Sequence, residues 1–292
     1  MAVAFEELST IRAERPGAIQ QALRARKRRS LIGDDGRLFI VAADHPARGA
    51  LGVGADDFAM SSRRDLLERL AVALSNTGVD GVLGTPDIID DLALMGLLDN
   101  KLVVGSMNRG GLRGSVFEFD DRYTAYTIPR IVEDGLDFAK NLVRVNLKDP
   151  ATARTLEHSA RAVDMAADAK IPLMLEPFMS SWIDGKAVND LSSDAVALSI
   201  AIAQGLGSTS AYSWLKVPVV EGMERVMEST TLPTLLLGGE THGRLDSAFE
   251  SWQNALTLPG VRGLVVGRSL LYPADGNVEQ AVATAASMVH PH

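Results

Sequence analysis

Lys216 lies inside an apolar segment, residues 212–218, and its setting suggests chemistry more directly than that of any other residue. A buried lysine is costly unless it is paired or neutral, and a neutral amine can attack a carbonyl carbon to form a Schiff base. Arg144, inside another apolar segment, is a cation that would lower the pKa of Lys216. We therefore predict a Schiff-base lysine at position 216. The alternative is a lysine at a strand end that reaches solvent.

Two carboxylates follow other apolar segments. Asp44 comes after residues 38–43, and Glu176 comes after residues 171–175. Both are candidates for proton transfer and for binding substrate hydroxyls near the reacting carbon. Salt bridges to Arg144 or Lys216 are the alternative interpretation. His45, next to Asp44, is interpreted either as a substrate contact or as a structural residue.

A phosphate site is indicated by glycines that end two further apolar segments. Gly238 and Gly239 follow one segment, and Gly267 precedes Arg268 at the end of the other. Glycine lets backbone N–H groups approach an anion, and an arginine can bind phosphate oxygens through two parallel bonds. Lys148, beyond the fourth apolar segment, is a further candidate for substrate binding.

These residues share one position in the pattern, since they lie at or near the ends of short apolar runs typical of buried strands. The runs cover residues 38–43, 79–83, 102–105, 142–147, 171–175, 212–217, 232–237 and 261–266. Helical patterns lie between or after them, at residues 63–74, 128–140, 151–169, 193–205, 220–228, 245–256 and 278–289. Alternating strands and helices indicate a parallel sheet.

Eight such units predict an α/β protein of the (β/α)8 TIM-barrel class, whose active sites lie at the carboxyl ends of the strands. We expect an N-terminal helical extension over residues 1–36 and the barrel over residues 37–292. A doubly wound open sheet is the alternative, but Asp44, His45 and Pro46 do not form its glycine-rich first turn.

The composition restricts the class of protein. The chain has 292 residues, 46% of them apolar, and no cysteine, which excludes disulfides, thiolate catalysis and cysteine-bound zinc. A net charge of −8 makes nucleic acid an improbable partner, and no apolar run of about 18 residues suggests a membrane span. The basic run at residues 24–29 is interpreted as the solvated face of an N-terminal helix. We expect a cytoplasmic protein without a signal peptide.

Several segments together resemble class I, Schiff-base aldolases of the deoxyribose-phosphate and tagatose-bisphosphate aldolase type. They are WLKVPVVEG at 214–222, LMLE at 173–176, LVVGRS at 264–269, and AADH at 42–45, which resembles archaeal-type fructose-bisphosphate aldolases. The resemblance covers about residues 37–275 and implies that Lys216 forms the Schiff base and that Gly267 and Arg268 bind phosphate. LVRVNL at 142–147 aligns with a strand that carries an internal lysine in that family, whereas this segment has Arg144.

The resemblance further implies reversible cleavage of a phosphorylated ketose or keto-acid sugar to dihydroxyacetone phosphate and an aldehyde, with no cofactor. It extends to an actinobacterial branch associated with inositol catabolism, whose substrate would be 6-phospho-5-dehydro-2-deoxygluconate and whose aldehyde would be malonate semialdehyde. Arg109, Arg113 and Lys148 are candidate cations for a carboxylate or a second phosphate. Aldolases of this group also suggest a homo-oligomer.

Two other functions compete with this one. In a metal-dependent lyase, His45, Glu176, Glu240 and His242 would offer ligands to a divalent ion. In a phosphosugar-binding barrel without turnover, the same phosphate site would remain and the lysine would be inactive. The apolar setting of Lys216 favours the imine, so we expect no metal site.

Overall fold

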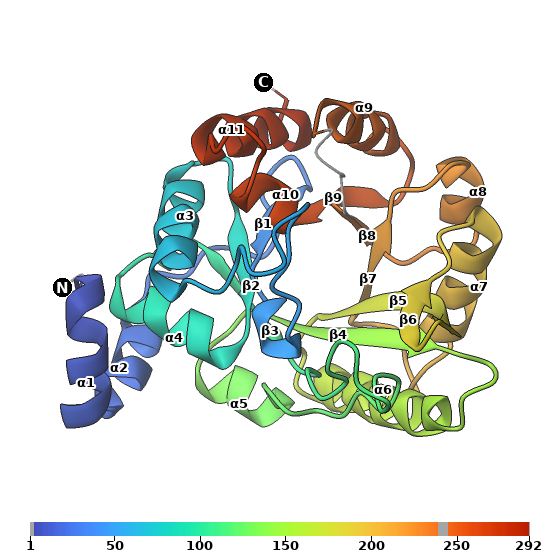
Figure 1. Ribbon diagram of the computed structural model, residues 1–292, viewed down its shortest axis with the longest axis horizontal. Helices are drawn as coiled ribbons and strands as arrows, with labels where there is room; N and C mark the ends of the chain where they lie inside the picture. The colour runs from blue at the N-terminus through green and yellow to red at the C-terminus, as the bar shows by residue number, and fades with distance from the viewer. Residues whose placement is uncertain (1–2, 239–244, 292) are drawn as a thin grey trace.

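The computed structural model describes residues 3–238 and 245–291. Eight parallel strands close into a barrel, and helices surround it (Figure 1). The barrel is closed by the β1–β9 and β4–β5 pairings, so the predicted (β/α)8 class is confirmed. The barrel strands are β1 Leu38–Ala42, β2 Gly81–Gly84, β3 Leu102–Ser106, β4 Phe138–Val145, β5 Leu173–Ile183, β7 Ser213–Pro218, β8 Thr234–Leu237 and β9 Val261–Val266.

The helices that cover the outside of the barrel largely follow the expected pattern. They are α3 Arg63–Ser75, α4 Pro86–Leu94, α5 Ile128–Glu133, α6 Ala151–Asp168, α7 Ser193–Gln204, α8 Met223–Glu228, α9 Leu245–Ala255, α10 Arg268–Leu271 and α11 Val278–Val289. The sequence patterns missed α4, α10 and β6 Lys186–Asn189, which forms an antiparallel hairpin with β5. These elements are short, and so their periodicity is weak.

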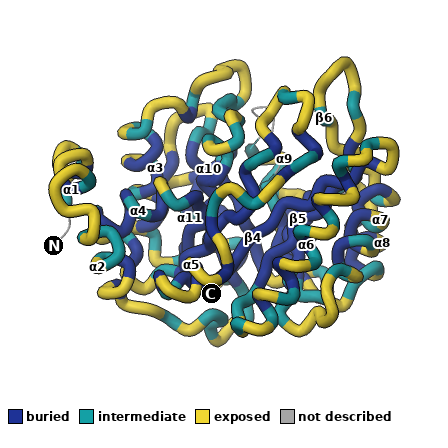
Figure 2. The backbone as a smooth tube through the Cα atoms, turned by 90° about the horizontal axis from the view of Figure 1, so that it is seen from below, coloured by how far each residue is buried: buried dark blue, intermediate teal, exposed yellow. Residues whose placement is uncertain are grey.

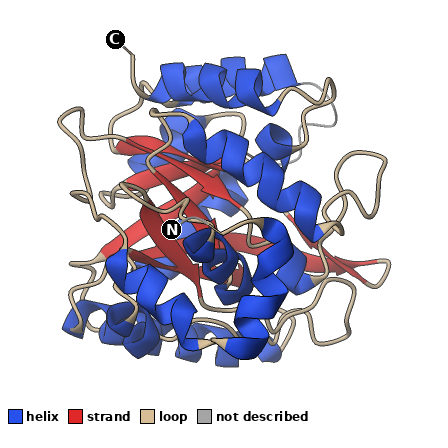
Figure 3. Ribbon diagram, turned by 90° about the vertical axis from the view of Figure 1, so that its left-hand side faces the viewer, coloured by secondary structure: helices blue, strands red, loops and turns tan. Residues whose placement is uncertain are grey.

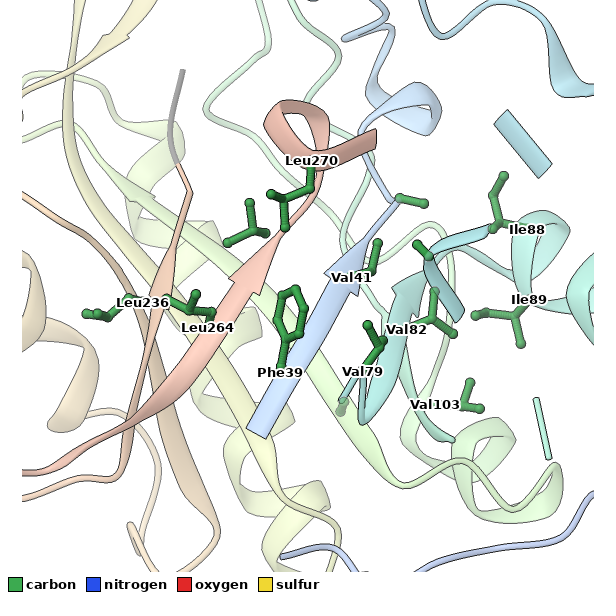
Figure 4. Packing of buried hydrophobic residues seen from close by; sticks show 14 of the residues in the cluster. Phe39, Val41, Val79, Val82, Ile88, Ile89, Val103, Leu236, Leu264 and Leu270 are labelled. Atoms are coloured by element: carbon green, nitrogen blue, oxygen red, sulfur yellow. The ribbon is translucent and has the colours of Figure 1, made fainter. Parts of the chain in front are cut away.

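Side chains alternate along each strand between the barrel interior and the helices. In β1, Leu38, Ile40 and Ala42 belong to a cluster of hydrophobic side chains inside the barrel, which we call the interior cluster. Phe39 and Val41 instead pack outward against neighbouring strands and helices (Figure 4). Burying a side chain such as Phe39 contributes about 1.5–3 kcal/mol. Figure 2 shows the result, with the strands buried and the connecting loops exposed. The same alternation carries the polar residues beyond the interior cluster into the barrel mouth.

The segment between α5 and β4 corrects one expectation. The sequence pattern predicts a helix over residues 128–140 and a strand over 142–147, but the helix ends at Glu133 and the strand already begins at Phe138. Gly135 adopts a left-handed conformation with φ of 68°, which ends the helix. Lys140 is therefore a strand residue rather than the last residue of a helix.

The N-terminal part forms a 3₁₀ turn at Phe5–Glu7 and two helices, α1 Leu8–Glu14 and α2 Gly17–Ala25, on the outside of the barrel near α4 (Figure 1). Figure 3 shows the N-terminus on this outer side, in front of the strands. Beyond α2 the chain is extended and runs under the strand starts. Leu31 and Ile32 pack against the interior cluster and close the lower end of the barrel.

The basic run at residues 24–29 is only in part a solvated helix face, since Arg24 lies on α2 and is exposed. α2 ends at Ala25, and Arg26 is only 8% exposed because it donates to the carbonyl oxygens of Lys101 and Gly135 and to Asp137. Arg28 and Arg29 also pair with carboxylates at the strand starts. A charge run in sequence does not reveal that buried carboxylates will face it, which is why the interpretation holds for Arg24 and is wrong for Arg26.

Candidate functional site

Two buried lysines share one carboxylate near the carboxyl ends of the barrel strands, which we call the upper end of the barrel. Glu176 Oε1 lies 2.7 Å from Lys216 Nζ, and Glu176 Oε2 lies 2.5 Å from Lys140 Nζ. The three residues come from the neighbouring strands β4, β5 and β7, whose parallel register places alternate residues on the same inner face. Lys140 and Lys216 are 1% and 3% exposed, so both ammonium groups depend on this carboxylate for compensation.

Asp44 extends the ionic row toward the other side of the barrel. Its Oδ2 accepts hydrogen bonds from Lys140 Nζ at 3.1 Å and Ser106 Oγ at 3.0 Å, and it lies 2.8 Å from an amino group of Arg109. Arg109, Asp44, Lys140, Glu176 and Lys216 therefore form one row of alternating charges. We call these five residues the central row.

The central row holds three basic groups and two carboxylates. Burial would raise the pKa of Asp44, but Arg109 and Lys140 hold it well below its usual range. Burial acts in the same direction on Glu176, and the two lysines outweigh it, so the pKa of this carboxyl is also lowered. Both carboxyl groups are therefore ionised, and the row becomes neutral when one lysine loses its proton.

Lys140 has a depressed pKa. Burial lowers the pKa of this lysine to about 8, with Arg109 and Lys216 acting in the same direction against the two carboxylates. A lysine with such a pKa exchanges its proton near neutral pH. Lys140 is thus suited to proton transfer within the row, a role that the sequence patterns assigned to neither Lys140 nor its segment.

His45 lies beside this row at the mouth of the barrel. Its Nδ1 is 3.9 Å from Asp44 Oδ1, and this buried nitrogen has no hydrogen-bond partner among the described residues. Burial lowers the pKa of His45 to about 3, with Arg268, Lys216 and Arg109 acting in the same direction against Asp44. The imidazole is therefore neutral and keeps one nitrogen for a bound molecule.

Arg144 is not placed as the sequence pattern suggested. Its guanidinium pairs with Glu118 Oε1 at 2.5 Å and donates to the Glu118 carbonyl oxygen at 2.6 Å. The charge that faces Lys216 across Glu176 comes from Lys140 instead. The mistaken strand boundary explains the difference, because a strand starting at residue 142 leaves Arg144 as its internal cation. β4 does carry an internal lysine, at position 140.

The glycine and arginine residues predicted to bind phosphate lie at the same end of the barrel. Arg268 begins α10, directly after β9, and donates to the Gly52 carbonyl oxygen at 3.2 Å. A Cβ at Gly267 would lie 2.2 Å from the Ala42 carbonyl oxygen, and one at Gly238 would lie 2.5 Å from a methyl group of Val266. Close packing therefore requires glycine at both positions. Gly239 lies outside the described residues.

Other candidates fall away from the central row. Lys148 and Arg113 are exposed. Glu240 and His242, half of the metal-ligand set considered from sequence, lie outside the described residues. Within residues 3–238 and 245–291 no group of three potential ligands is arranged to hold a metal ion, and both oxygens of Glu176 contact lysines.

Sequence reasoning missed Lys140, Arg109 as the partner of Asp44, and Ser106. Lys140 was detectable, because Phe138, Lys140 and Leu142 alternate with residues on the helix-facing side of the strand. Arg109 and Ser106 carry no local signal, since only the closed barrel brings β3 beside Asp44.

The fold and the site define the molecule as a (β/α)8 barrel with a buried lysine–carboxylate row at the carboxyl ends of its strands. The chain belongs to the Cgl0159-like family, whose model matches residues 36–286. The crystal structure of Cgl0159 from Corynebacterium glutamicum is 65% identical over 98% of this chain and 96% of that chain, with a TM-score of 0.96.

More distant solved structures share the barrel. A structure titled as an archaeal fructose 1,6-bisphosphate aldolase is 17% identical, with a TM-score of 0.68 over 94% of this chain and all of that chain. An archaeal fructose-1,6-bisphosphate aldolase, described with its catalytic lysine bound to the carbinolamine intermediate, is 18% identical, with a TM-score of 0.65 over 93% of this chain and 99% of that chain. A search of the curated proteins gives no match. No helix in the described part of the chain is long and apolar enough to cross a bilayer.

Proposed function

We propose that this protein is a class I aldolase in which Lys216 forms an imine with the ketone of a phosphorylated ketose or keto-acid sugar. The observation that carries the proposal is the buried contact of Lys216 and Lys140 with the two oxygens of Glu176. A row with one excess positive charge can release one lysine proton at a modest cost, and the neutral amine is the nucleophile that imine formation needs. The shared fold of the archaeal aldolases supports this reading.

The contacts favour Lys216 over Lys140 as the nucleophile. Lys140 is held between two carboxylates, Asp44 and Glu176, whereas among the described residues Lys216 forms an ion pair with Glu176 alone. Lys216 also lies on β7, next to β8, and the two glycine turns proposed for phosphate follow β8 and β9. A ketone adjacent to a phosphate held there would reach Lys216 before Lys140.

The reaction would use the central row as follows. The neutral amine of Lys216 adds to the ketone carbon, Lys140 supplies a proton to the hydroxyl of the resulting carbinolamine, and that hydroxyl leaves as water to give a protonated imine. Asp44, Glu176 or a bound water removes the proton from the hydroxyl β to that carbon; the carbon–carbon bond breaks, and its electrons enter the imine to give an enamine. The aldehyde departs, a proton returns to the enamine carbon, and hydrolysis releases dihydroxyacetone phosphate and Lys216.

Lys140 would assist these steps through Glu176. Because its Nζ lies between Asp44 and Glu176, Lys140 keeps both carboxylates charged and moves a proton toward either one. Its lowered pKa, about 8, suits that exchange. His45 would bind a substrate oxygen through its unpartnered nitrogen.

Gly238, Gly239, Gly267 and Arg268 would bind the phosphate, with Lys148 at the rim as a weaker contact. The resemblance to the inositol-catabolism branch makes 6-phospho-5-dehydro-2-deoxygluconate the substrate that we propose, with malonate semialdehyde as the second product. A panel of phosphoketoses, assayed for dihydroxyacetone phosphate by coupled reduction, tests this assignment. Equal kcat/KM for sugar bisphosphates and the keto-acid would contradict it.

Borohydride trapping tests the imine itself. The protein is incubated with dihydroxyacetone phosphate and borohydride, and the modified peptide is mapped by mass spectrometry. We expect one reduced adduct on Lys216 in the unmodified chain and none in Lys216→Met, whereas exposed Lys186→Met serves as the control that keeps the adduct. An adduct on Lys140 or Lys148 would overturn the choice of nucleophile. No adduct, with activity abolished by a chelator, would support the metal-dependent lyase instead.

The phosphate contact has its own kinetic test. Losing one charge-assisted contact typically costs about 1.5–3 kcal/mol, or roughly 10- to 150-fold in affinity. Arg268→Ala should therefore raise KM for a phosphorylated substrate by that factor and leave cleavage of an unphosphorylated analogue nearly unchanged. Equal losses with both compounds would show that Arg268 acts on the fold or the chemistry rather than on phosphate.

A further inference from the structure

A second group of charges lies at the barrel mouth, beyond the central row. Arg48 ends the 3₁₀ turn Pro46–Arg48 after β1, Arg144 lies near the end of β4, and Glu118 belongs to the long connection between β3 and α5. Glu118 Oε1 lies 2.5 Å from Arg144 and 3.4 Å from Arg48, so both guanidinium groups share one carboxylate oxygen. The other oxygen accepts a hydrogen bond from the Gly114 backbone at 2.8 Å.

The two arginines are not fully satisfied by this glutamate. The Nε of Arg144 is buried without a hydrogen-bond partner among the described residues, although the residue is only 5% exposed. The Nε of Arg48 donates a hydrogen bond to the Gly111 carbonyl oxygen at 3.2 Å. Asp121 lies nearby, but its Oδ1 accepts from the Gly111 backbone and its Oδ2 has no partner in the described chain. A buried donor without a partner in the protein leaves room for a contact with a bound group.

The repulsion between the arginines supports this interpretation. Burial lowers the pKa of Arg48 to about 9, and Arg144 and Arg109 act in the same direction, whereas Asp121 and Glu118 oppose them. An additional or better placed anion would relieve this repulsion. Glu118 and Asp121 already offset part of this repulsion, so an anion that takes the place of Glu118 would have to offset it equally well.

The two arginines lie farther toward the barrel mouth than the lysines of the central row. Arg144 lies four residues after Lys140 on the same inward-facing side of β4, which is about 13 Å along a strand. Arg268 lies on the other side of the mouth, at the end of β9. β9 lies opposite β4 in the barrel order but pairs with β1. The far end of a substrate whose phosphate binds Arg268 would therefore be directed toward Arg144, and Arg48 would reach it through the Glu118 oxygen that the two arginines share.

We propose that Arg48 and Arg144 form a second anion subsite, which Glu118 fills in the free protein and which the remote carboxylate or phosphate of the substrate takes over. The inference deepens the proposed aldolase function and rests on it for the identity of the substrate. The substrate class is a keto-sugar phosphate with a second anionic group at its other end. Glu118 is a specificity-determining residue in this scheme, because it competes with that group.

The exchange is electrostatically conservative. An incoming anion would replace one carboxylate by another acidic group between the same arginines, so no buried guanidinium loses its counterion. Glu118 is 4% exposed, so the exchange requires its side chain to leave a buried position, although Val116 and Phe117 just before it are 93% and 48% exposed. Substrates with an uncharged far end would gain nothing from displacing it.

Anion binding, measured without turnover, tests the subsite. Arg268→Ala is used as background to weaken the other phosphate site, and malonate or inorganic phosphate is titrated by calorimetry. Adding Glu118→Gln removes the competing charge and nearly preserves the shape, so we expect affinity for at least one anion to rise about tenfold. Tighter binding of malonate alone identifies a carboxylate subsite, and tighter binding of phosphate alone a phosphate subsite.

Matched variants separate this effect from general charge or folding effects. Asp120→Asn removes a neighbouring carboxylate that pairs with Arg122 and Arg154 and should leave both affinities unchanged. Arg144→Met, combined with Glu118→Gln, should abolish the gain. If Glu118→Gln does not fold, Arg48→Met, which keeps the Arg144–Glu118 pair, should still reduce anion binding relative to Arg268→Ala alone.

The outcomes distinguish the subsite from the aldolase proposal. Equal affinities for both anions with and without Glu118→Gln would overturn the subsite, even if borohydride labels Lys216. A tenfold gain without any trapped imine would retain the subsite and reject the aldolase function. Both results together would establish a two-anion substrate.

Discussion

The two ends of the barrel both bury basic side chains against carboxylates, but they satisfy these charges in different ways. At the lower end, Asp137 pairs with Arg26 and Arg28 and also accepts a hydrogen bond from the Val103 backbone at 2.9 Å. Asp80 likewise pairs with Arg29 and accepts from the Phe39 backbone at 2.6 Å. Each carboxylate is tied to the start of a strand.

At the upper end, the hydrogen bonds and ion pairs that the carboxylate groups of Asp44 and Glu176 make with described residues come from side chains alone. Buried atoms without a partner also gather there, including Arg109 Nε, Arg144 Nε and His45 Nδ1, against Arg26 Nε at the lower end. A charge bonded to the backbone stabilises one conformation. A charge held only by other side chains can exchange partners, so the comparison separates groups that hold the barrel from groups available for chemistry.

Replacing one aspartate at each end gives the largest contrast. Breaking a buried ion pair on one side costs about 3–5 kcal/mol, because it leaves an uncompensated charge. Asp137→Asn should lower the free energy of unfolding by that amount, measured by urea denaturation, and leave kcat of the folded protein unchanged. Asp44→Asn should instead lower kcat by about 10²- to 10⁴-fold if it serves in proton transfer. The reverse pattern would remove the distinction between the two ends.

Lys140, at the upper end, should make the free energy of unfolding depend on pH. The native pKa of this lysine, about 8, lies below the ordinary value of 10.5, so between these values the unfolded chain binds more protons than the native one. Stability from this group must therefore rise as pH increases through that window, by an amount on the order of 3 kcal/mol. Urea denaturation at pH 8 and pH 10 should show this rise relative to Lys140→Met. Parallel pH profiles of the two proteins would contradict it.

His290 should show the smallest effect, with the opposite sign. Hydrogen bonds to Asp80 and Asp35 outweigh burial and raise the pKa of this histidine above its usual value. Its contribution is therefore complete below the unfolded pKa of about 6.5 and disappears as pH rises through the higher native pKa. His290→Gln should cost under about 1 kcal/mol at pH 6 and less at pH 9, since the side chain is partly exposed. Thermal melting at both pH values measures the difference.

Patterns in the sequence predicted the barrel because strand and helix segments alternate, and placed Asp44, Glu176, Lys216, Gly267 and Arg268 at one end of it. They did not predict Lys140, because the helical pattern of α5 was extended past Gly135. They could not predict Arg109 beside Asp44 or Glu118 beside Arg144, since these pairs join residues 65 and 26 positions apart. Alternation is local information, whereas pairings between separate strands and loops depend on the closed sheet.

Asp80 also links distant parts of the chain, with a consequence for the order of folding. It contacts Arg29, 51 residues before it, and His290, 210 residues after it, and β1 itself pairs with β9. The first strand therefore keeps an open edge until the last strand has formed, and the contact of Asp80 with His290 is completed at the same stage. Such long sequence separation slows closure. During synthesis on the ribosome, the early segment must wait for nearly the whole chain, which makes strand β1 the part most in need of protection from premature association.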